Sequence, residues 1–178
     1  MIIYKDKMSG EELFTDAFHV HEEETHMKFC GKLTLEKDSI DEKMFGGNAS
    51  AEDQQEQHED SERSGLDFVL ASHLIEGHLS SKKDFQTYFK EYFKKLQEKK
   101  FPCPAEGEDK TEYDCKVKEF KKRAKGFFDF VLENHKDLCC YYSENDFAGE
   151  NNCCFVKWLD DKNVEVYVFK DGLESEKY

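Results

Sequence analysis

The stretch from Phe45 to Gln54 reads F-G-G-N-A-S-A-E-D-Q, and it opens a strongly acidic part of the chain. Gly46, Gly47 and Asn48 tolerate the positive φ angles that a tight reversal of the backbone requires. The residues from 52 to 62 then supply six carboxylates and three glutamines. Such a segment buries too little apolar surface to offset the entropy lost on ordering. We therefore expect a tight turn that leads into a mobile acidic loop over about 46–64.

After this loop, the pattern over residues 82–135 predicts two helices that pack as an antiparallel hairpin. Ser80 or Ser81 is expected to cap the first helix, and Pro102 ends it because proline lacks an N–H and disfavours helix in the residue before it. The second helix is expected from about Glu112 to Asn134. The two apolar stripes that would face the core are Phe85, Tyr88, Phe89, Tyr92, Phe93 and Leu96, and then Val117, Phe120, Ala124, Phe127, Phe128, Val131 and Leu132.

The flanks of the hairpin are typical of strands. Val164, Val166 and Val168 recur at every second position, which is the period of a sheet. The turn at 160–163 separates this strand from a continuous apolar run before it. The further strand candidates are Leu138–Tyr142, Cys153–Leu159, Ile2–Tyr4, Met27–Leu35 and Leu66–Leu70. The order predicts an α+β fold in one domain over 1–178.

Three separated motifs resemble the translationally controlled tumour protein (TCTP) family. The family's signature is matched by Phe45, Gly46, Gly47, Asn48, Ala49, Ser50, Ala51 and Glu52. M-I-I-Y-K-D at residues 1–6 is similar to the family's first strand, and F-K-D-G-L-E at 169–174 is similar to its end. One position departs from the pattern, because Ser143 stands where the family usually has glycine. The resemblance covers essentially the whole chain.

The resemblance implies a β-tent-type mixed sheet with an inserted α-helical hairpin. It also implies a non-enzymatic interaction protein that regulates growth, translation and cell survival. The implied partners are tubulin and microtubules, elongation-factor and Rheb-type GTPases, and Bcl-type apoptosis regulators. A guanine-exchange role toward a Rheb-type GTPase, and a thiol-dependent reductase on the same fold, are the alternatives.

The charge of the chain is unevenly distributed. The formal net charge is −14, which argues against nucleic acid as a primary partner. Residues 82–125 nevertheless carry fourteen Lys and Arg against nine Asp and Glu. We expect this basic hairpin to meet the acidic tails of tubulin, the alternative being a solvated helix surface. Its candidate contacts are Lys90, Lys94, Lys95, Lys118, Lys121, Lys122, Arg123 and Lys125.

The resemblance also implies a GTPase-binding surface. The family's acidic contact residue falls on Glu12, which is present. Its basic partner falls on Thr87, so Lys90, one helical turn later, is expected to substitute.

The start of the chain lacks the basic and apolar regions of a signal peptide. No apolar run reaches the roughly 20 residues that a membrane span needs. We therefore expect a cytoplasmic protein, and the resemblance adds release from cells by a non-classical route.

No motif for catalysis is present, neither a phosphate-binding glycine loop nor a nucleophile elbow. His19 and His21 would share one face of a strand, where an exposed pair is expected rather than a metal site. The seven cysteines include the adjacent pairs Cys139-Cys140 and Cys153-Cys154, each of which offers one thiol to each sheet face. The spacing of a zinc knuckle is absent, so zinc is not expected.

Calcium binding is implied by the resemblance and would be weak. The sequence has no EF-hand loop. Oxygen ligands are available on Asn48, on the acidic segment, and on Glu144 and Asp146. The alternative is an acidic surface that only keeps the protein in solution.

Overall fold

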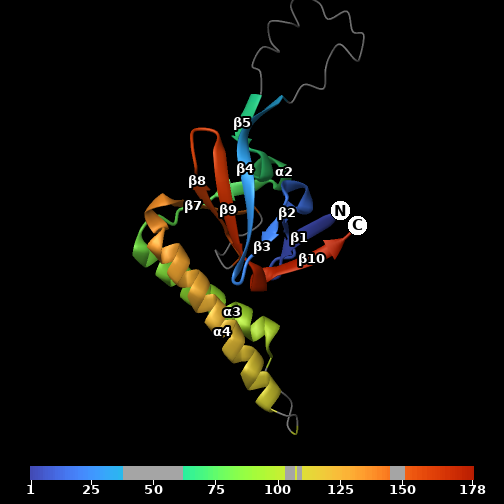
Figure 1. Ribbon diagram of the computed structural model, residues 1–178, viewed down its shortest axis with the longest axis vertical. Helices are drawn as coiled ribbons and strands as arrows, with labels where there is room; N and C mark the ends of the chain where they lie inside the picture. Colours follow the sequence, from blue (N-terminus) through green and yellow to red (C-terminus); the bar gives the residue numbers. More distant parts are fainter. Residues whose placement is uncertain (38–61, 103–106, 108–109, 145–150) are drawn as a thin grey trace, which may run out of the picture.

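Two antiparallel sheets and a long helical hairpin form the architecture (Figure 1). The computed structural model describes residues 1–37, 62–102, 107, 110–144 and 151–178. The signature from Phe45 to Glu52, most of the predicted acidic loop, and the calcium candidates Asn48 and Asp146 lie outside the described residues. The hairpin leaves the sheets at one end and projects away from them.

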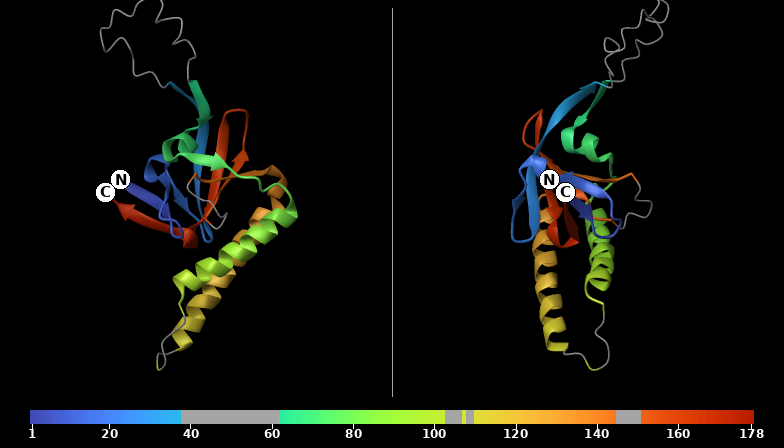
Figure 2. Two further views of the ribbon diagram at one scale, coloured as in Figure 1. Left: turned by 180° about the vertical axis from the view of Figure 1, so that it is seen from behind. Right: turned by 90° about the vertical axis from the view of Figure 1, so that its right-hand side faces the viewer.

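The smaller sheet joins the two ends of the chain. Its strands are β1 (Ile2–Asp6), β2 (Glu12–Thr15) and β10 (Leu173–Lys177), in the order β10-β1-β2. Ile2 pairs with Lys177, and the Met1 amino group donates to the Tyr178 carbonyl at 2.9 Å. The termini are therefore neighbours, as Figure 2 shows.

The larger sheet has the order β3-β4-β9-β8-β7-β6, with β5 paired beside β4. Its strands are β3 (His21–Glu22), β4 (His26–Lys37), β5 (Glu62–Leu66), β6 (Leu74–Glu76), β7 (Leu138–Ser143), β8 (Cys154–Trp158) and β9 (Asn163–Phe169). The helices are α2 (Asp67–Ser72), α3 (Lys82–Lys100) and α4 (Lys110–Glu133), with 3-10 turns at Asp16–Phe18, His135–Asp137 and Lys170–Gly172.

The predicted α+β class with an inserted hairpin is confirmed. The expected mixed pairing is not found, since every strand pair in the described part of the chain is antiparallel. The hairpin explains one of these pairs, because its two antiparallel helices bring the chain back to its point of departure. β7 then runs beside β6 in the opposite direction.

The helix boundaries follow from local chemistry. Ser81 is the N-cap of α3: its hydroxyl accepts from the Asp84 N–H at 3.2 Å, and the Asp84 carboxylate accepts from the Ser81 N–H at 3.4 Å. Of the two serines predicted for this role, Ser81 is therefore the cap. The helix ends at Lys100, two residues before Pro102, as the sequence predicts.

Two expectations on the flanks were wrong. The strand expected over Leu66–Leu70 ends at Leu66 and becomes helix α2, because the Asp67 carboxylate accepts from the Phe68 N–H at 2.8 Å and from the Lys32 N–H at 3.1 Å. His19 and His21 do not share a strand. His19 adopts a left-handed φ of 54° after a 3-10 turn, so only His21 enters β3.

The larger sheet carries a buried core on each of its faces. The hairpin covers one face, where Phe89, Phe127, Phe155 and Phe169 meet in one aromatic core. The other face packs on α2 and the smaller sheet through valines of β8 and β9. Cys153 belongs to the first core and Cys154 to the second, which confirms that adjacent cysteines point to opposite faces.

Candidate partner-binding surface on the helical hairpin

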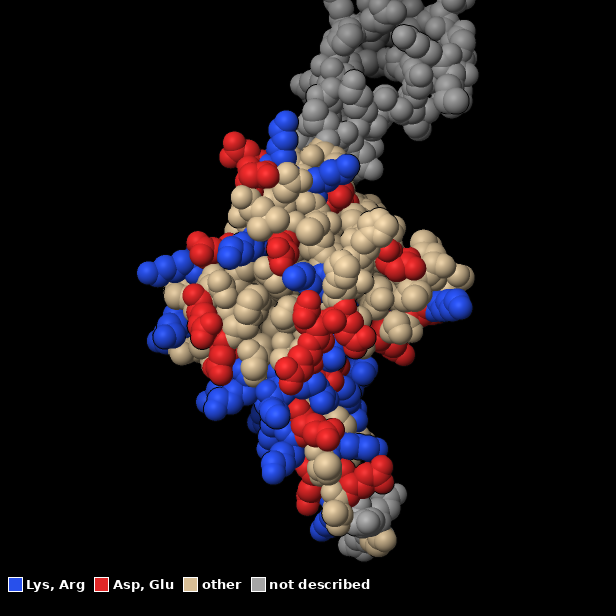
Figure 3. Space-filling model, viewed as in Figure 1, with Lys and Arg blue, Asp and Glu red and all other residues tan. Residues whose placement is uncertain are grey.

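Basic side chains gather where the hairpin leaves the sheets (Figure 3). The predicted contacts Lys90, Lys94, Lys118, Lys121, Lys122 and Lys125 are all exposed. Lys95 is half-buried, and Arg123 points inward to an acidic partner described below. The structure thus places most of the predicted basic residues on the open surface of α3 and α4.

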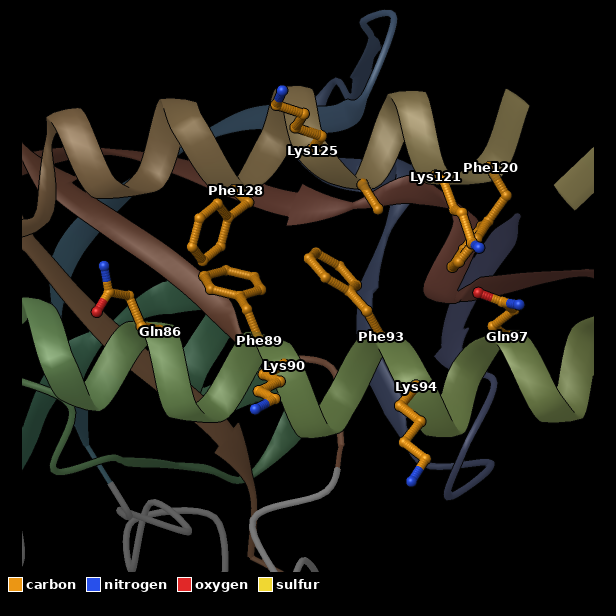
Figure 4. A pocket seen from close by; sticks show the side chains of 11 residues that line it. Gln86, Phe89, Lys90, Phe93, Lys94, Gln97, Phe120, Lys121, Lys125 and Phe128 are labelled. Carbon is orange, nitrogen blue, oxygen red and sulfur yellow. The ribbon is translucent and has the colours of Figure 1, made fainter. Parts of the chain in front are cut away.

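An apolar groove of about 470 Å³ runs between the two helices (Figure 4). Its apolar walls come from phenylalanines of both helices and from Ala124. Four lysines flank it, Lys90 and Lys94 on α3 and Lys121 and Lys125 on α4. All the side chains that line it are Gln86, Phe89, Lys90, Phe93, Lys94, Gln97, Phe120, Lys121, Ala124, Lys125 and Phe128. The groove therefore combines an apolar interior with a positive rim.

The groove forms because two phenylalanines lie at the edge of the apolar helix faces. Phe89 is buried against the sheet, whereas Phe93 and Phe128 are only half-buried. The Phe89 ring stacks on Phe93 at 5.1 Å between centroids and meets the edge of Phe128 at 5.7 Å. This ring cluster joins the helices and leaves its outer side open to solvent. The sequence signal for it is a phenylalanine followed by lysine at 89–90, 93–94 and 120–121.

Arg123 has an internal partner. Its guanidinium donates to the two Asp171 carboxylate oxygens at 2.7 and 3.1 Å, and the Lys100 ammonium donates to the same carboxylate at 2.6 Å. Burial alone would raise the pKa of Asp171, but the hydrogen bonds from Arg123 and Lys100 outweigh burial and hold this pKa below its ordinary value. Ion pairs from Lys100 of α3 and Arg123 of α4 to Asp171 therefore connect the hairpin to the turn between β9 and β10. The sequence analysis did not predict this contact.

The two residues of the predicted GTPase surface lie on different elements. Glu12 is half-buried on β2, opposite Lys5 of β1. Lys90 is exposed on α3, and Thr87 lies one turn before it. Within the described residues, no hydrogen bond or ion pair joins Glu12 to Lys90. A partner that contacts both would have to span the smaller sheet and the hairpin.

The thiols of Cys140 and Cys153 interact in the aromatic core beneath the hairpin. The Cys153 thiol donates to the Cys140 sulfur, which lowers the pKa of Cys140 to about 7. Burial opposes this shift, and backbone N–H groups of Leu79 and Gly77 support it. The same hydrogen bond, together with burial, raises the pKa of Cys153. Both side chains are at most 4% exposed, so access to this thiol pair is restricted.

The residues that the structure describes provide no prepared metal centre. No group of three or more His, Cys, Asp or Glu side chains among them is arranged to hold an ion. Glu144, the described calcium candidate, is exposed just after β7. No described helix is both long and apolar enough to cross a bilayer.

Known proteins similar to this chain share one description. A family model described as translationally controlled tumour protein matches residues 1–174. The chain is 38% identical over 182 residues to a homolog of that protein from Lumbricus rubellus, with 99% of each sequence covered. It is 34% identical over 183 residues to a homolog from Branchiostoma belcheri, with both sequences covered in full.

Solved structures agree with this similarity. The fold matches a translationally controlled tumor-associated protein from Schizosaccharomyces pombe with a TM-score of 0.71 at 27% identity, over 100% of both chains. It matches a translationally-controlled tumor protein from Caenorhabditis elegans with a TM-score of 0.63 at 26% identity, over 100% of this chain and 99% of the other.

Proposed function

Because the chain belongs to the translationally controlled tumour protein family, we propose that it is a non-enzymatic interaction protein whose basic hairpin binds acidic protein partners. Tubulin, whose tails are acidic, is the first partner that we propose. The main support for this proposal is that exposed lysines of both helices surround one groove, and that no carboxylate side chain lines this groove. This positive surface stands out from a chain with a formal charge of −14.

Electrostatics explains how such a surface would select its partners. The acidic remainder of the molecule repels acidic proteins, so attraction is confined to the hairpin and orients the encounter. Charges on exposed lysines are screened beyond about 10 Å at 0.1 M salt. Binding through them should therefore weaken as salt is raised.

Co-sedimentation with microtubules tests the proposal. The test variant carries Lys90→Glu, Lys94→Glu, Lys121→Glu and Lys125→Glu. Its matched control carries Lys83→Glu, Lys136→Glu, Lys162→Glu and Lys177→Glu, which are exposed residues that do not line the groove and change the net charge equally. Arg123 is left unchanged because it holds Asp171.

We expect salt-sensitive binding that the groove variant loses and the control largely retains. Equal loss in both variants would show a response to net charge alone and contradict a specific surface. Binding that neither variant weakens would move the search to the Glu12 surface.

The remaining family roles are proposals of the same kind. These are contacts with elongation-factor, Rheb-type and Bcl-type partners, a cytoplasmic location and weak calcium binding. The separation of Glu12 from Lys90 on β2 and α3 supports a GTPase contact only for a partner broad enough to reach both. Titration of calcium into wild-type protein and a Glu144→Gln variant would test the described calcium candidate.

Thiol chemistry is the second candidate function, and the Cys140–Cys153 pair is the observation that favours it. Two adjacent thiols can reduce a sulfoxide to a thioether, forming one disulfide and one water. With a dithiol reductant added to reduce the disulfide after each cycle, turnover of methionine sulfoxide that is lost in Cys140→Ser and kept in Cys139→Ser would support this function. The burial of both thiols argues against it.

A further inference from the structure

We infer that the hairpin groove binds an acidic protein segment through one large apolar side chain, which enters between α3 and α4 while neighbouring carboxylates meet the lysine rim. The inference rests on the proposed function and specifies what its partner must contain. A purely acidic tail would use only the rim. The apolar interior indicates a partner that carries one large apolar side chain, called the anchor below, as well as negative charges.

The interior of the groove can hold such an anchor. Its volume of about 470 Å³ lies in the range of sites that enclose small ligands, roughly 300–1,000 Å³. Phe93 and Phe128 present half-buried rings to this space, and the rings of Phe89, Phe93 and Phe128 converge between the helices (Figure 4). An aromatic or long aliphatic side chain placed there would gain ring contacts and lose water.

The rim can hold the acidic residues on both sides of the anchor. Lys90 and Lys94 are one helical turn apart on α3, and Lys121 and Lys125 are one turn apart on α4. Each pair therefore presents two positively charged side chains on one side of the groove, with Cβ atoms about 6 Å apart. Gln86 and Gln97 are the other polar residues that line it. A segment with carboxylates before and after its anchor matches this arrangement.

The described part of the chain leaves the groove free for a partner. Every residue that lines it belongs to α3 or α4, so no other described element enters it. The buried faces of the same helices already pack on the sheet through Phe85, Tyr92 and Phe127. A partner segment can therefore dock without displacing the core.

The proposed occupant is an acidic peptide with one large apolar side chain, so its binding can be tested directly. The probes are two short fluorescent peptides of glutamate and glycine that differ only at the central residue, phenylalanine in one and alanine in the other. Binding of each to the full chain is measured by fluorescence anisotropy at low and moderate salt. Because the phenylalanine-to-alanine change is made in the peptide and not in the protein, the fold of the protein is unaffected.

Two protein variants locate the binding. Ala124→Met places a longer side chain at a residue that lines the groove, without a change of charge. The combined Lys90→Gln, Lys94→Gln, Lys121→Gln and Lys125→Gln variant removes the rim charges, and Lys83→Gln, Lys136→Gln, Lys162→Gln and Lys177→Gln is its control. Thermal melts confirm that each variant is folded.

We expect the phenylalanine peptide to bind roughly tenfold more tightly than the alanine peptide, as the burial of one ring predicts. This ratio should persist as salt rises and vanish in Ala124→Met, while the rim variant weakens both peptides. Equal affinity for the two peptides would overturn the anchor and leave the acidic-partner function intact. A ratio unchanged in Ala124→Met would place the anchor elsewhere and also overturn the inference. No binding of either peptide would reject the hairpin surface itself.

Discussion

The guanidinium of Arg123 in α4 holds the buried carboxylate of Asp171 with two hydrogen bonds, across 48 positions of sequence. Asp171 is 7% exposed and belongs to the turn that leads from β9 into β10. The contact joins the hairpin to the place where the two sheets meet. The pair therefore helps the aromatic core to fix the orientation of the hairpin relative to the sheets.

Removal of Arg123 should destabilise the protein. Arg123→Ala leaves Asp171 buried with Lys100 as its remaining cationic partner, and a carboxylate with too few partners costs free energy. We expect a loss of about 2 kcal/mol in the free energy of unfolding, reduced from the cost of a fully buried pair because Arg123 reaches solvent. Urea denaturation measures it. Lys118→Ala, at an exposed position, is the control and should change stability by less than about 0.5 kcal/mol.

The same carboxylate predicts a loss of stability in acid. The pKa of Asp171 lies below its ordinary value of 3.8 in the folded protein, so the unfolded chain takes up its proton first as the pH falls. The stabilisation is complete above this ordinary pKa and is lost as the pH falls through the folded pKa. Urea midpoints between about pH 5 and pH 2.5 should fall more steeply for wild type than for Asp171→Asn. Parallel curves would show that Asp171 makes no such contribution.

His26 predicts a second pH dependence, close to neutrality. Its ring stacks on Phe130 at 5.2 Å, and burial lowers its pKa from 6.5. The folded protein therefore favours the neutral ring, and its stability falls as the pH drops below 6.5 toward the lowered pKa. The melting temperature of wild type should decrease between about pH 7.5 and 5.5 more than that of His26→Gln.

Charges around His26 partly cancel, so burial should dominate this effect. The nearby carboxylates raise the pKa of His26 and the nearby ammonium groups lower it; these residues are Glu23, Lys28, Glu165 and Lys170. Salt should therefore change the pH response only slightly. A response that disappears at high salt would assign it to these charges and not to burial.

Gly172 should not tolerate a larger residue. A Cβ atom at this position would collide with the Tyr92 hydroxyl and lie 2.8 Å from the Asn152 amide nitrogen. We expect Gly172→Ala to cost about 1–3 kcal/mol, as overpacked cores do. Chemical denaturation of the single variants and of the double variant with Tyr92→Phe measures the cost.

The double variant identifies the cause. The Tyr92 hydroxyl is buried without a hydrogen-bond partner among the described residues, so its removal alone should be neutral or stabilising. Tyr92→Phe should then recover part of the loss in Gly172→Ala. Simple addition of the two effects would show that the clash is not with this hydroxyl.

Local sequence patterns predicted the long helices and strand β9 correctly, because each of these segments is long enough to show its own hydrophobic periodicity. The hairpin helices follow from the spacing of their aromatic residues, and Ser81 and Pro102 mark the limits of α3. The valines of β9 recur at every second position because all of them face the core shared with α2 and the smaller sheet. The short strands β2, β5, β6 and β10 escaped prediction, since three to five residues hold too little periodicity.

The sequence by itself determined the α+β class, the hairpin and the surplus of lysine on it, because periodicity and charge are properties of short segments. Only the tertiary structure decided which of these basic residues are available. It turned Arg123 inward to Asp171, left Lys90, Lys94, Lys121 and Lys125 exposed, and opened a groove among them. The physical reason is that an ion pair over 48 positions, or a space between two helices, depends on how distant segments pack. No local pattern along one segment contains that information.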